Sequence, residues 1–475
     1  MSVRPLAELE ARVRRNLDLT SHPTLDWMPR TDGPDGAHVH DVAIAGAGQG
    51  GVAVAFQLMR ERVTNVLLFD KAPRGLEGPW STYARMPTLR SPKDYTGPDL
   101  GLPSLTYRAW HEARFGDADW SRLDLIPAHL WAEYLLWVRD VTGVVAENET
   151  ELVGIAPAPG DLLALRLRSK QGERTEFARK LVLATGQDGA GRWLVPDCVK
   201  ALPRERWSAT DDAIAFEALA GKDVAVLGAG ASAADNASMA LEAGARTVNL
   251  FVRRTRMQRI QPYRWLTFSG FLRHYADLDD AWRWRFMSHI LGLRESIPQP
   301  TYDRMRAFAN FEIVTDGAWL DAKLEAGRVK LSTPRGVYRA DYLISCIGMD
   351  VDFAARPELR PFAGAIQTWG DVYTPPKAEA NARLARYPYL DANGAYREKA
   401  PGTAPFLRHI YDFTFAATMS QGASGCSINA MKIAAPRLAA GLTRALFRAD
   451  IERHWASLQA FDTTVFEPAP IDRDK

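Results

Sequence analysis

Two stretches of the chain repeat one pattern of apolar and polar positions. Each has a short apolar run, a glycine-rich turn, a helical segment and a second apolar run, and the two copies begin at Asp41 and Lys222. Short apolar runs bounded by turns predict buried strands, and the periodicity between them predicts crossover helices. The pattern predicts an α/β fold with two doubly wound, Rossmann-like nucleotide-binding domains.

The first turn reads Gly46-Ala47-Gly48-Gln49-Gly50-Gly51 and lies between a predicted strand and a predicted helix. Gly46 permits the tight turn, Gly48 lets the backbone approach a pyrophosphate, and Gly51 lets helix and strand pack closely. The helix N-terminus then offers free N–H groups to the phosphates. Asp70 ends the next strand, where a carboxylate accepts hydrogen bonds from ribose hydroxyls. This region is predicted to bind a dinucleotide.

The second turn reads Gly228-Ala229-Gly230-Ala231-Ser232-Ala233, with alanine at the third fingerprint position, which the motif allows. The strand that follows ends at Arg253-Arg254 and carries no acid there. A carboxylate would repel a 2′-phosphate, whereas an arginine fork binds it, so the pair predicts NADPH. The alternative is that both arginines are solvated surface charges.

Composition narrows the class of protein. The chain has 475 residues, 47% hydrophobic and 24% charged, with a net charge of +2, which is ordinary for a globular protein and argues against a nucleic-acid or membrane-surface partner. Three distant cysteines predict no disulfide framework, no dithiol centre and no metal site. The start lacks the apolar segment of a signal peptide and no apolar run is long enough to span a bilayer, so a cytoplasmic location is expected.

Residues 41–450 resemble the class B flavin monooxygenases, which comprise flavin-containing, N-hydroxylating and Baeyer–Villiger enzymes. The resemblance rests on Gly78-Pro79-Trp80, Leu183-Ala184-Thr185-Gly186, Ser345-Cys346-Ile347-Gly348, Arg90-Ser91-Pro92-Lys93-Asp94 and Phe251 to Thr255. It implies FAD at the first turn, NADPH at the second, and an NADPH domain inserted in the FAD domain. The expected divisions are a helical extension at 1–40, FAD domain at 41–200, NADPH domain at 201–340 with an irregular, Trp-rich insertion at about 260–310, and FAD domain with C-terminal helices at 341–475.

Two positions depart from the family pattern. The linker signature Phe-x-Gly-x-x-x-His-Ser falls on 201–208, where only Ser208 survives, and the asparagine beside the flavin is replaced by Arg90. These departures leave the subclass and the substrate open.

The resemblance implies that NADPH reduces FAD, that O₂ then gives a C4a-(hydro)peroxyflavin, and that one oxygen atom enters a small organic substrate at a nucleophilic nitrogen or sulfur. Alternatives are Baeyer–Villiger oxidation of a ketone, or an NADPH oxidase or reductase that passes electrons to O₂ or a partner. A disulfide reductase needs a cysteine pair that the chain lacks. The expected partners are the small-molecule substrate and O₂; a homo-oligomer is left open.

Three residues are candidates for catalysis by resemblance. Lys93 is expected near the peroxide or the nicotinamide, Arg90 is expected to hold the peroxide as an anion, and Asn429 is expected one turn into a helix that follows the glycine-rich segment 421–425 at the flavin. The alternatives are a surface lysine, an ordinary salt bridge and a surface polar residue. Cys426 is interpreted as a packing residue. The expected cofactor-binding residues are Gly46, Gly48, Gln49, Gly50, Gly51, Asp70, Lys71, Gly78, Trp80, Thr185, Gly186, Gln187, Gly228, Gly230, Ala231, Ser232, Ala233, Arg253, Arg254, Gly422 and Gly425.

Overall fold

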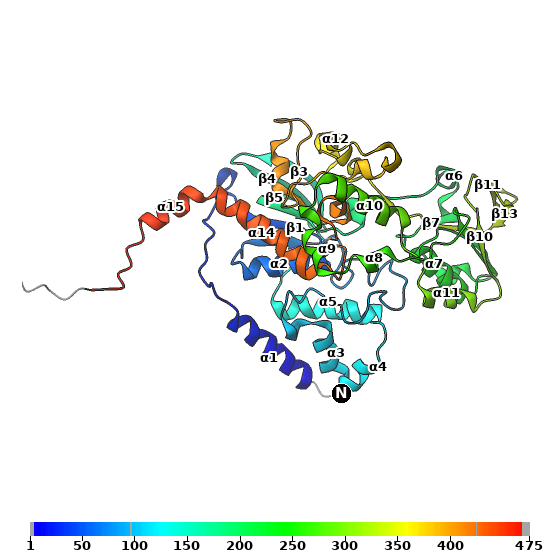
Figure 1. Ribbon diagram of the computed structural model, residues 1–475, viewed down its shortest axis with the longest axis horizontal. Coiled ribbons are helices and arrows are strands. Elements are labelled where there is room, and N and C mark those ends of the chain that lie inside the picture. Colours follow the sequence, from blue (N-terminus) through cyan, green and yellow to red (C-terminus); the bar gives the residue numbers. More distant parts are fainter. Residues whose placement is uncertain (1–3, 96, 424, 468–475) are drawn as a thin grey trace, which may run out of the picture.

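Two separate sheets follow the two repeats of the sequence pattern (Figure 1). The computed structural model describes residues 4–95, 97–423 and 425–467. The first sheet has the order β2-β1-β5-β4-β3, with β16 paired to β5. Its strands are β1 (Val39–Ala45), β2 (Val66–Phe69), β3 (Glu151–Ala158), β4 (Leu162–Ser169), β5 (Gly172–Leu183) and β16 (Ile410–Asp412).

The central part of this first sheet is parallel. Strand β1 pairs in parallel with β2 and β5, and β16 pairs in parallel with β5, whereas β3 and β4 form an antiparallel edge. The central strands are buried on both faces, which explains why they appear in the sequence as unbroken apolar runs. Helix α2 (Gln49–Arg60) and helix α14 (Met431–Ala449) pack against each other beside it.

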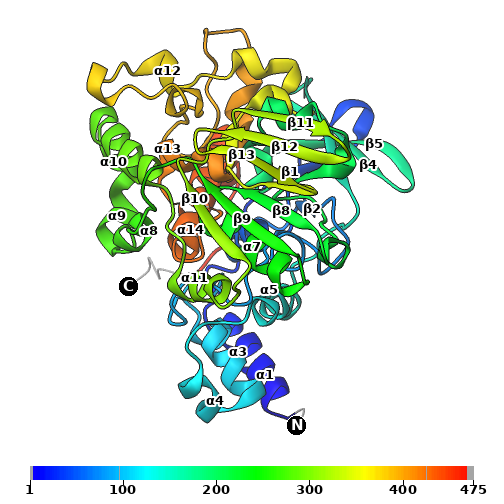
Figure 2. The same ribbon diagram turned by 90° about the vertical axis from the view of Figure 1, so that its right-hand side faces the viewer.

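The second sheet is entirely parallel and has the order β10-β9-β8-β14-β7 (Figure 2). Its strands are β7 (Trp207–Ala209), β8 (Asp223–Leu227), β9 (Thr247–Val252), β10 (Phe311–Thr315) and β14 (Tyr342–Ser345). Helices α7 (Ala231–Glu242) and α11 (Gln299–Arg306) contact each other, and α7 packs on β8 and β9. An antiparallel sheet of β11 (Asp321–Glu325), β12 (Arg328–Thr333) and β13 (Gly336–Ala340) completes this domain, beside α6 (Asp197–Lys200).

The chain crosses between the two sheets twice, and the two crossings touch. Strand β6 (Gly191–Trp193) lies on the outward crossing, and β15 (Met349–Val351) lies on the return. They pair antiparallel, with Asp350 opposite Arg192. Addition of a Cβ to Gly191 would place it 2.1 Å from the Asp350 carbonyl oxygen, so the contact requires glycine.

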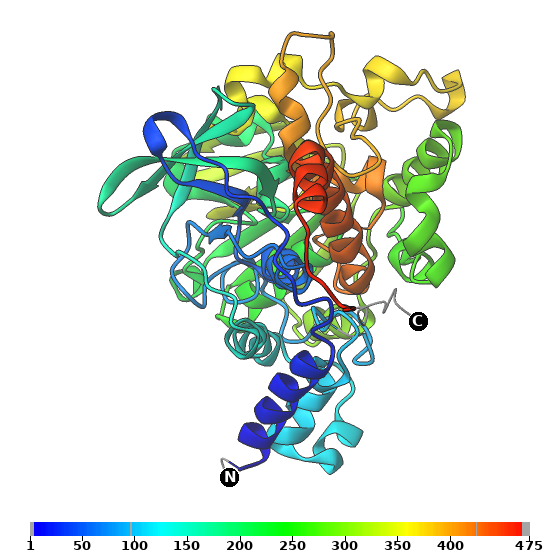
Figure 3. The ribbon, with the colours of Figure 1, turned by 90° about the vertical axis from the view of Figure 1, so that its left-hand side faces the viewer.

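The N-terminal helix α1 (Arg4–Leu19) packs on the helices that connect β2 to β3 of the first sheet (Figure 3). It contacts α3 (Tyr107–Phe115) and α5 (Ala128–Thr142), and its Leu9 and Val13 are buried in the core of the first domain. Helix α4 (Asp117–Arg122) packs on α3. Residues 4–19 therefore contribute to the core of the FAD-side domain.

The segment at 260–310 is helical where the sequence analysis expected irregular structure. It forms α8 (Pro262–Trp265), α9 (Ser269–His274), α10 (Asp280–Leu293) and the start of α11. Helix α10 begins where the Asp279 side chain accepts the Trp282 N–H, and it buries Trp284, Met287, Ile290 and Leu291. Arginines and exposed aromatics interrupt this apolar face in the sequence, which obscured its helical spacing.

The C-terminal part of the chain also begins its long helix later than expected. Helix α14 begins at Met431, so Asn429 precedes it instead of lying one turn inside it. The remaining helices are α12 (Trp369–Val372), α13 (Thr418–Gln421) and α15 (Ile451–Gln459). Among the helices in the described part of the chain, none combines the length and the apolar character required to cross a bilayer.

Candidate active site

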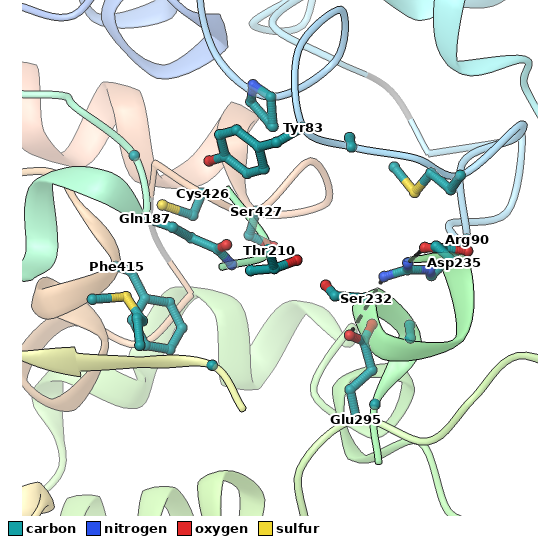
Figure 4. Close-up of a pocket in the computed structure, with 18 of the residues that line it drawn as sticks. Tyr83, Arg90, Gln187, Thr210, Ser232, Asp235, Glu295, Phe415, Cys426 and Ser427 are labelled. Atoms are coloured by element: carbon teal, nitrogen blue, oxygen red, sulfur yellow. Dashed lines mark hydrogen bonds and ion pairs between the residues drawn. The ribbon is translucent and has the colours of Figure 1, made fainter. Parts of the chain in front are cut away.

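One large cavity is lined by both glycine-rich turns and by the crossings between the domains (Figure 4). Its volume is about 1690 Å³. A pocket for a single small ligand measures roughly 300–1,000 Å³. The cavity is therefore large enough for two nucleotides and a substrate side by side.

The first turn has the geometry that a dinucleotide pyrophosphate requires. Gly46 has φ +103°, and a Cβ there would lie 2.6 Å from the Ala184 carbonyl oxygen. A Cβ on Gly51 would lie 1.8 Å from the Gly46 oxygen, so helix and strand pack at glycine distance. Gly48, by contrast, has open space before it, with its nearest neighbour Gly78 at 3.9 Å. No side chain caps the α2 N-terminus, so its first N–H groups are available to phosphate oxygens.

Asp70 has a different set of partners from the one expected. Its carboxylate accepts hydrogen bonds from the Ala47 N–H at 2.7 Å and the Ala72 N–H at 2.8 Å, and it lines the cavity. Burial raises the pKa of this carboxyl. Asp70 therefore braces the turn as well as facing the cavity. The buried Gln49 Oε1 has no partner among the described residues, which fits a site whose hydrogen bonds are completed by FAD.

The second turn is equally open. A Cβ on Gly230 would have only the Glu295 carbonyl oxygen nearby, at 3.7 Å, and no side chain caps the N-terminus of α7. Arg254 donates to the carbonyls of Gly292 at 2.8 Å and Leu293 at 3.2 Å. Arg253 is exposed and, within the described residues, its guanidinium has no hydrogen-bond or ion-pair partner. The two arginines therefore differ: Arg254 ties β9 to the end of α10, and Arg253 is free to bind a phosphate.

Most of the residues predicted for the site line this cavity; the exceptions are Gly51, Lys93, Ala233 and Gly422. Gly51 and Ala233 lie at helix–strand contacts. Gly422 has φ +76° and packs on the Tyr275 ring, so its role is in the fold of the loop. Ser424, in the same glycine-rich segment, lies outside the described residues.

Lys93 lies outside the cavity wall. Its ammonium donates to the carbonyls of Trp120 at 2.9 Å and Leu123 at 2.6 Å, and it lies 4.9 Å from the Trp120 ring centroid. These contacts fix the ammonium at the end of α4 and use two of its three N–H donors. The structure favours the alternative in which Lys93 has a structural role.

Arg90 does line the cavity, but protein carboxylates neutralise it. It pairs with Asp235 on α7 and, at 3.5 Å, with Glu295. Asp235 is almost fully buried, and burial raises the pKa of its carboxyl while Arg90 opposes that rise. Figure 4 shows the three side chains together at the α7 side of the cavity. Arg90 thus links a loop of the FAD domain to the NADPH domain, which is the salt-bridge alternative.

Asn429 lies on the cavity wall beside Ser427, whose hydroxyl donates to its side-chain oxygen. Cys426 lines the same edge, and burial raises the pKa of its thiol to about 12. A thiol that stays protonated is a poor nucleophile, which supports the interpretation of Cys426 as a packing residue.

Several residues of the cavity were not recognised in the sequence. Tyr83 donates to Asp188 at 3.2 Å, and Trp193 donates to the same oxygen at 3.0 Å. Arg85 donates to the carbonyls of Thr210 and Asp212, both at 2.5 Å, and so links the FAD-side domain to the segment that follows β7. The only sequence signal for these residues is that their segments contain arginine and aromatic residues. No motif with a fixed spacing includes them.

The sequence is similar to those of known proteins. Residues 43–188 match a family described as FAD-NAD(P)-binding, and residues 122–275 match one described as L-lysine 6-monooxygenase/L-ornithine 5-monooxygenase. An FAD-dependent urate hydroxylase from Xanthomonas campestris pv. campestris is 39% identical over 464 residues, which cover 97% of each chain. This protein is a class B flavin monooxygenase.

Solved structures of the class share its fold. An ornithine N-hydroxylase from Kutzneria sp. 744, described with reduced FAD, NADP⁺ and L-ornithine, has a TM-score of 0.66 and 16% identity, covering 86% of this chain and 99% of that one. An ornithine hydroxylase from Pseudomonas aeruginosa has a TM-score of 0.67 and 16% identity, covering 86% and 100%. The class B monooxygenase described here is thus an oxidoreductase with two dinucleotide-binding domains that uses FAD and NADP, as the sequence motifs predicted.

Proposed function

We propose that this enzyme is an NADPH-dependent urate hydroxylase. The observation that carries the proposal is the 39% identity to an FAD-dependent urate hydroxylase along nearly the whole of both chains. A match of that extent includes both nucleotide domains, the helices over the cavity and the C-terminal segment, so it is not confined to the cofactor motifs.

The chemistry of the cavity supports a flat, anionic substrate. Its wall at α8 and α10 combines apolar side chains (Leu266, Met287 and Ile290) with hydrogen-bond donors. The nearby carboxylate of Glu295 is taken by Arg90 and Gln261. Urate presents carbonyl oxygens and a negative charge to such donors.

The reaction balances as urate, NADPH, H⁺ and O₂ giving hydroxylated urate, NADP⁺ and water. Bound FAD supplies the transfer of reducing equivalents from NADPH to O₂, which protein side chains do not perform. The open space beside Gly48 and Gly230 admits the two pyrophosphates. The N-terminal N–H groups of α2 and α7, which no side chain caps, bind them. The Arg90–Asp235 pair holds the two nucleotide domains together.

A second candidate is hydroxylation at the side-chain nitrogen of ornithine or lysine, which falls within the oxygenation at a nucleophilic nitrogen or sulfur that the family resemblance implied. The match of residues 122–275 to the lysine and ornithine monooxygenases favours it. The two candidates differ in substrate charge and shape, so a direct comparison separates them.

The test is turnover of the purified holoenzyme with urate, L-ornithine and L-lysine under ¹⁸O₂. Urate is expected to be consumed with NADPH in equal amounts, and the product is expected to carry one ¹⁸O atom. Hydrogen peroxide is assayed in parallel. If an ¹⁸O-labelled product forms from ornithine or lysine and not from urate, N-hydroxylation replaces the proposal. If every substrate gives hydrogen peroxide and no labelled product, the enzyme is an oxidase.

A further inference from the structure

Arg294 lies at the C-terminal end of α10 in a backbone conformation that arginine rarely adopts. Its φ is +66°, in the left-handed region that favours glycine. The side chain reaches Gly348: the Arg294 Nη1 lies 3.5 Å from the position that a Cβ on Gly348 would occupy. Strained backbone of this kind persists where the surrounding structure holds it, often at ligand sites.

The guanidinium of Arg294 is half-buried in the cavity wall, yet it has no hydrogen bond or ion pair with any residue in the described part of the chain. The other half-buried arginines that line the cavity are occupied. Arg85 and Arg90 are bound as described above, Arg304 pairs with Glu242, Arg356 pairs with Glu358, and Arg383 donates to the Met349 carbonyl and lies 3.5 Å from Asp350. Arg253, Arg259 and Arg264 are also unpaired on this wall but are exposed, so Arg294 is the half-buried arginine of the described cavity that is left for a ligand.

Phenol and guanidinium donors lie around Arg294, and the two carboxylates nearby, Glu295 and Asp350, are paired with Arg90 and Arg386. Tyr263 and Arg383 line the same part of the cavity, and Tyr387 packs behind them. Burial raises the pKa of Tyr387 to about 12 and raises that of Tyr263 further, while Arg294 opposes both rises, so both phenols keep their protons at neutral pH. Neither phenol oxygen has a hydrogen-bond partner among the described residues.

Apolar side chains line the cavity beside these donors. Met287 and Ile290 on α10 and Leu266, directly after α8, are buried, and the same two helices carry Tyr263 and Arg294 at their ends. A wall that combines apolar side chains with donors suits a flat ring system with oxygen atoms on its edge and a negative charge.

We infer that Arg294, with Tyr263, forms the subsite that binds the anionic edge of a planar oxo-heterocycle, for which urate is the probe. The inference rests on the proposed function for the choice of ligand. The guanidinium forms charge-assisted hydrogen bonds to the oxygen atoms of the anion, and the phenol of Tyr263 donates a further one. The position over Gly348, on the return crossing to the FAD domain, sets the subsite apart from the free Arg253 at the end of β9.

A coenzyme phosphate is the alternative ligand for the Arg294 guanidinium. The next residue, Glu295, has its carbonyl oxygen 3.7 Å from the position of a Cβ on Gly230, in the second glycine-rich turn. Both ligands are anions, so charge alone does not separate them. The dissociation constants of urate and of NADPH, measured on the same variant, show which of the two ligands Arg294 binds.

The experiment uses R294Q holoenzyme and, as matched control, R285Q. Arg285 lies on the same helix and pairs with Glu379 away from the cavity. Urate binding is titrated by the change in flavin absorbance without NADPH, and NADPH binding is titrated without urate. R294Q is expected to weaken urate binding by about tenfold or more, the scale of one charge-assisted contact. NADPH binding and the peroxide formed without substrate are expected to stay as in R285Q.

Unchanged urate binding in R294Q would overturn the inference, and so would a loss confined to NADPH, which would assign Arg294 to the coenzyme. The inference and the proposed function fail separately. Wild-type enzyme that binds urate through Arg294 without oxygenating it would refute the function alone. Hydroxylation of urate with the same KM in R294Q would refute the subsite alone.

Discussion

The separation of Arg253 from Arg254 leads to a prediction about coenzyme choice. Arg253→Ala is expected to weaken NADPH binding and to leave NADH binding unchanged, because only NADPH carries the 2′-phosphate that an unpaired arginine at the end of β9 can bind. Arg254→Ala removes two bonds to the end of α10 and is expected to act on stability.

The magnitude follows from the exposure of the two side chains. A hydrogen bond to a charged group contributes about 1.5–3 kcal/mol, and an exposed site lies at the lower end. Arg253 is exposed, so we expect a loss of about 1.5 kcal/mol, which is about tenfold in the NADPH dissociation constant. Arg254 is also exposed, and its two carbonyl bonds are expected to contribute about 1–2 kcal/mol to the free energy of unfolding.

The assay is the anaerobic rate of flavin reduction as a function of NADPH and of NADH, combined with urea unfolding of each variant. The expected result is a selective NADPH defect in R253A and a lowered unfolding midpoint in R254A. Equal losses for both coenzymes in R253A would refute the reasoning, because a residue that contacts the 2′-phosphate cannot affect NADH.

Three further predictions follow from single positions. Gly48→Val is expected to give folded but colourless protein, because a Cβ there meets no protein atom closer than 3.9 Å and fills the space of the pyrophosphate; circular dichroism and released FAD measure this, and a yellow G48V protein would refute the site. Lys93→Ala is expected to keep wild-type coupling of product to NADPH while losing about 1–3 kcal/mol of stability with its two carbonyl bonds; uncoupling without loss of stability would return Lys93 to the active site. Burial lowers the pKa of Lys180 from 10.5 to about 8, so the unfolded chain binds more protons between these values and the unfolding free energy of the wild type should rise from pH 8 to 10.5, by up to about 3 kcal/mol. Lys180→Met should lack this rise in denaturation measured across that window, and an identical rise in both proteins would show that Lys180 is not its source.

The parts of the site that the sequence predicted are those determined by local chain geometry. Gly46, Gly48 and Gly51 each do in the structure what the fingerprint requires of a turn, an open face and a close packing contact. These requirements arise within a few residues of chain, so a motif carries them. The parallel sheets follow for the same reason, because buried strands leave unbroken apolar runs.

The parts that the sequence did not predict depend on which charge meets which partner across the fold. Lys93 lies in a recognisable motif, yet its direction is decided by carbonyls of α4 some 30 residues away in the chain. The direction of the Arg90 side chain is set by its ion pair with Asp235, which belongs to the other domain. Arg294 lay in a segment expected to be irregular, and its importance comes from the absence of a partner in the described structure, which no pattern of residues reveals.

The pairing of β16 with β5 has a consequence for biosynthesis. The FAD-side sheet is begun by residues 39–45 and completed by residues 410–412, and the wall of its cavity includes residues 425–429. The ribosome therefore makes the entire NADPH domain before it makes the residues that close the FAD pocket. Since domains fold as units during synthesis, the inserted domain can fold while the first remains incomplete. Flavin capture is then a late event, and chains that terminate before residue 410 are expected to emerge without the cofactor, as substrates for proteolysis.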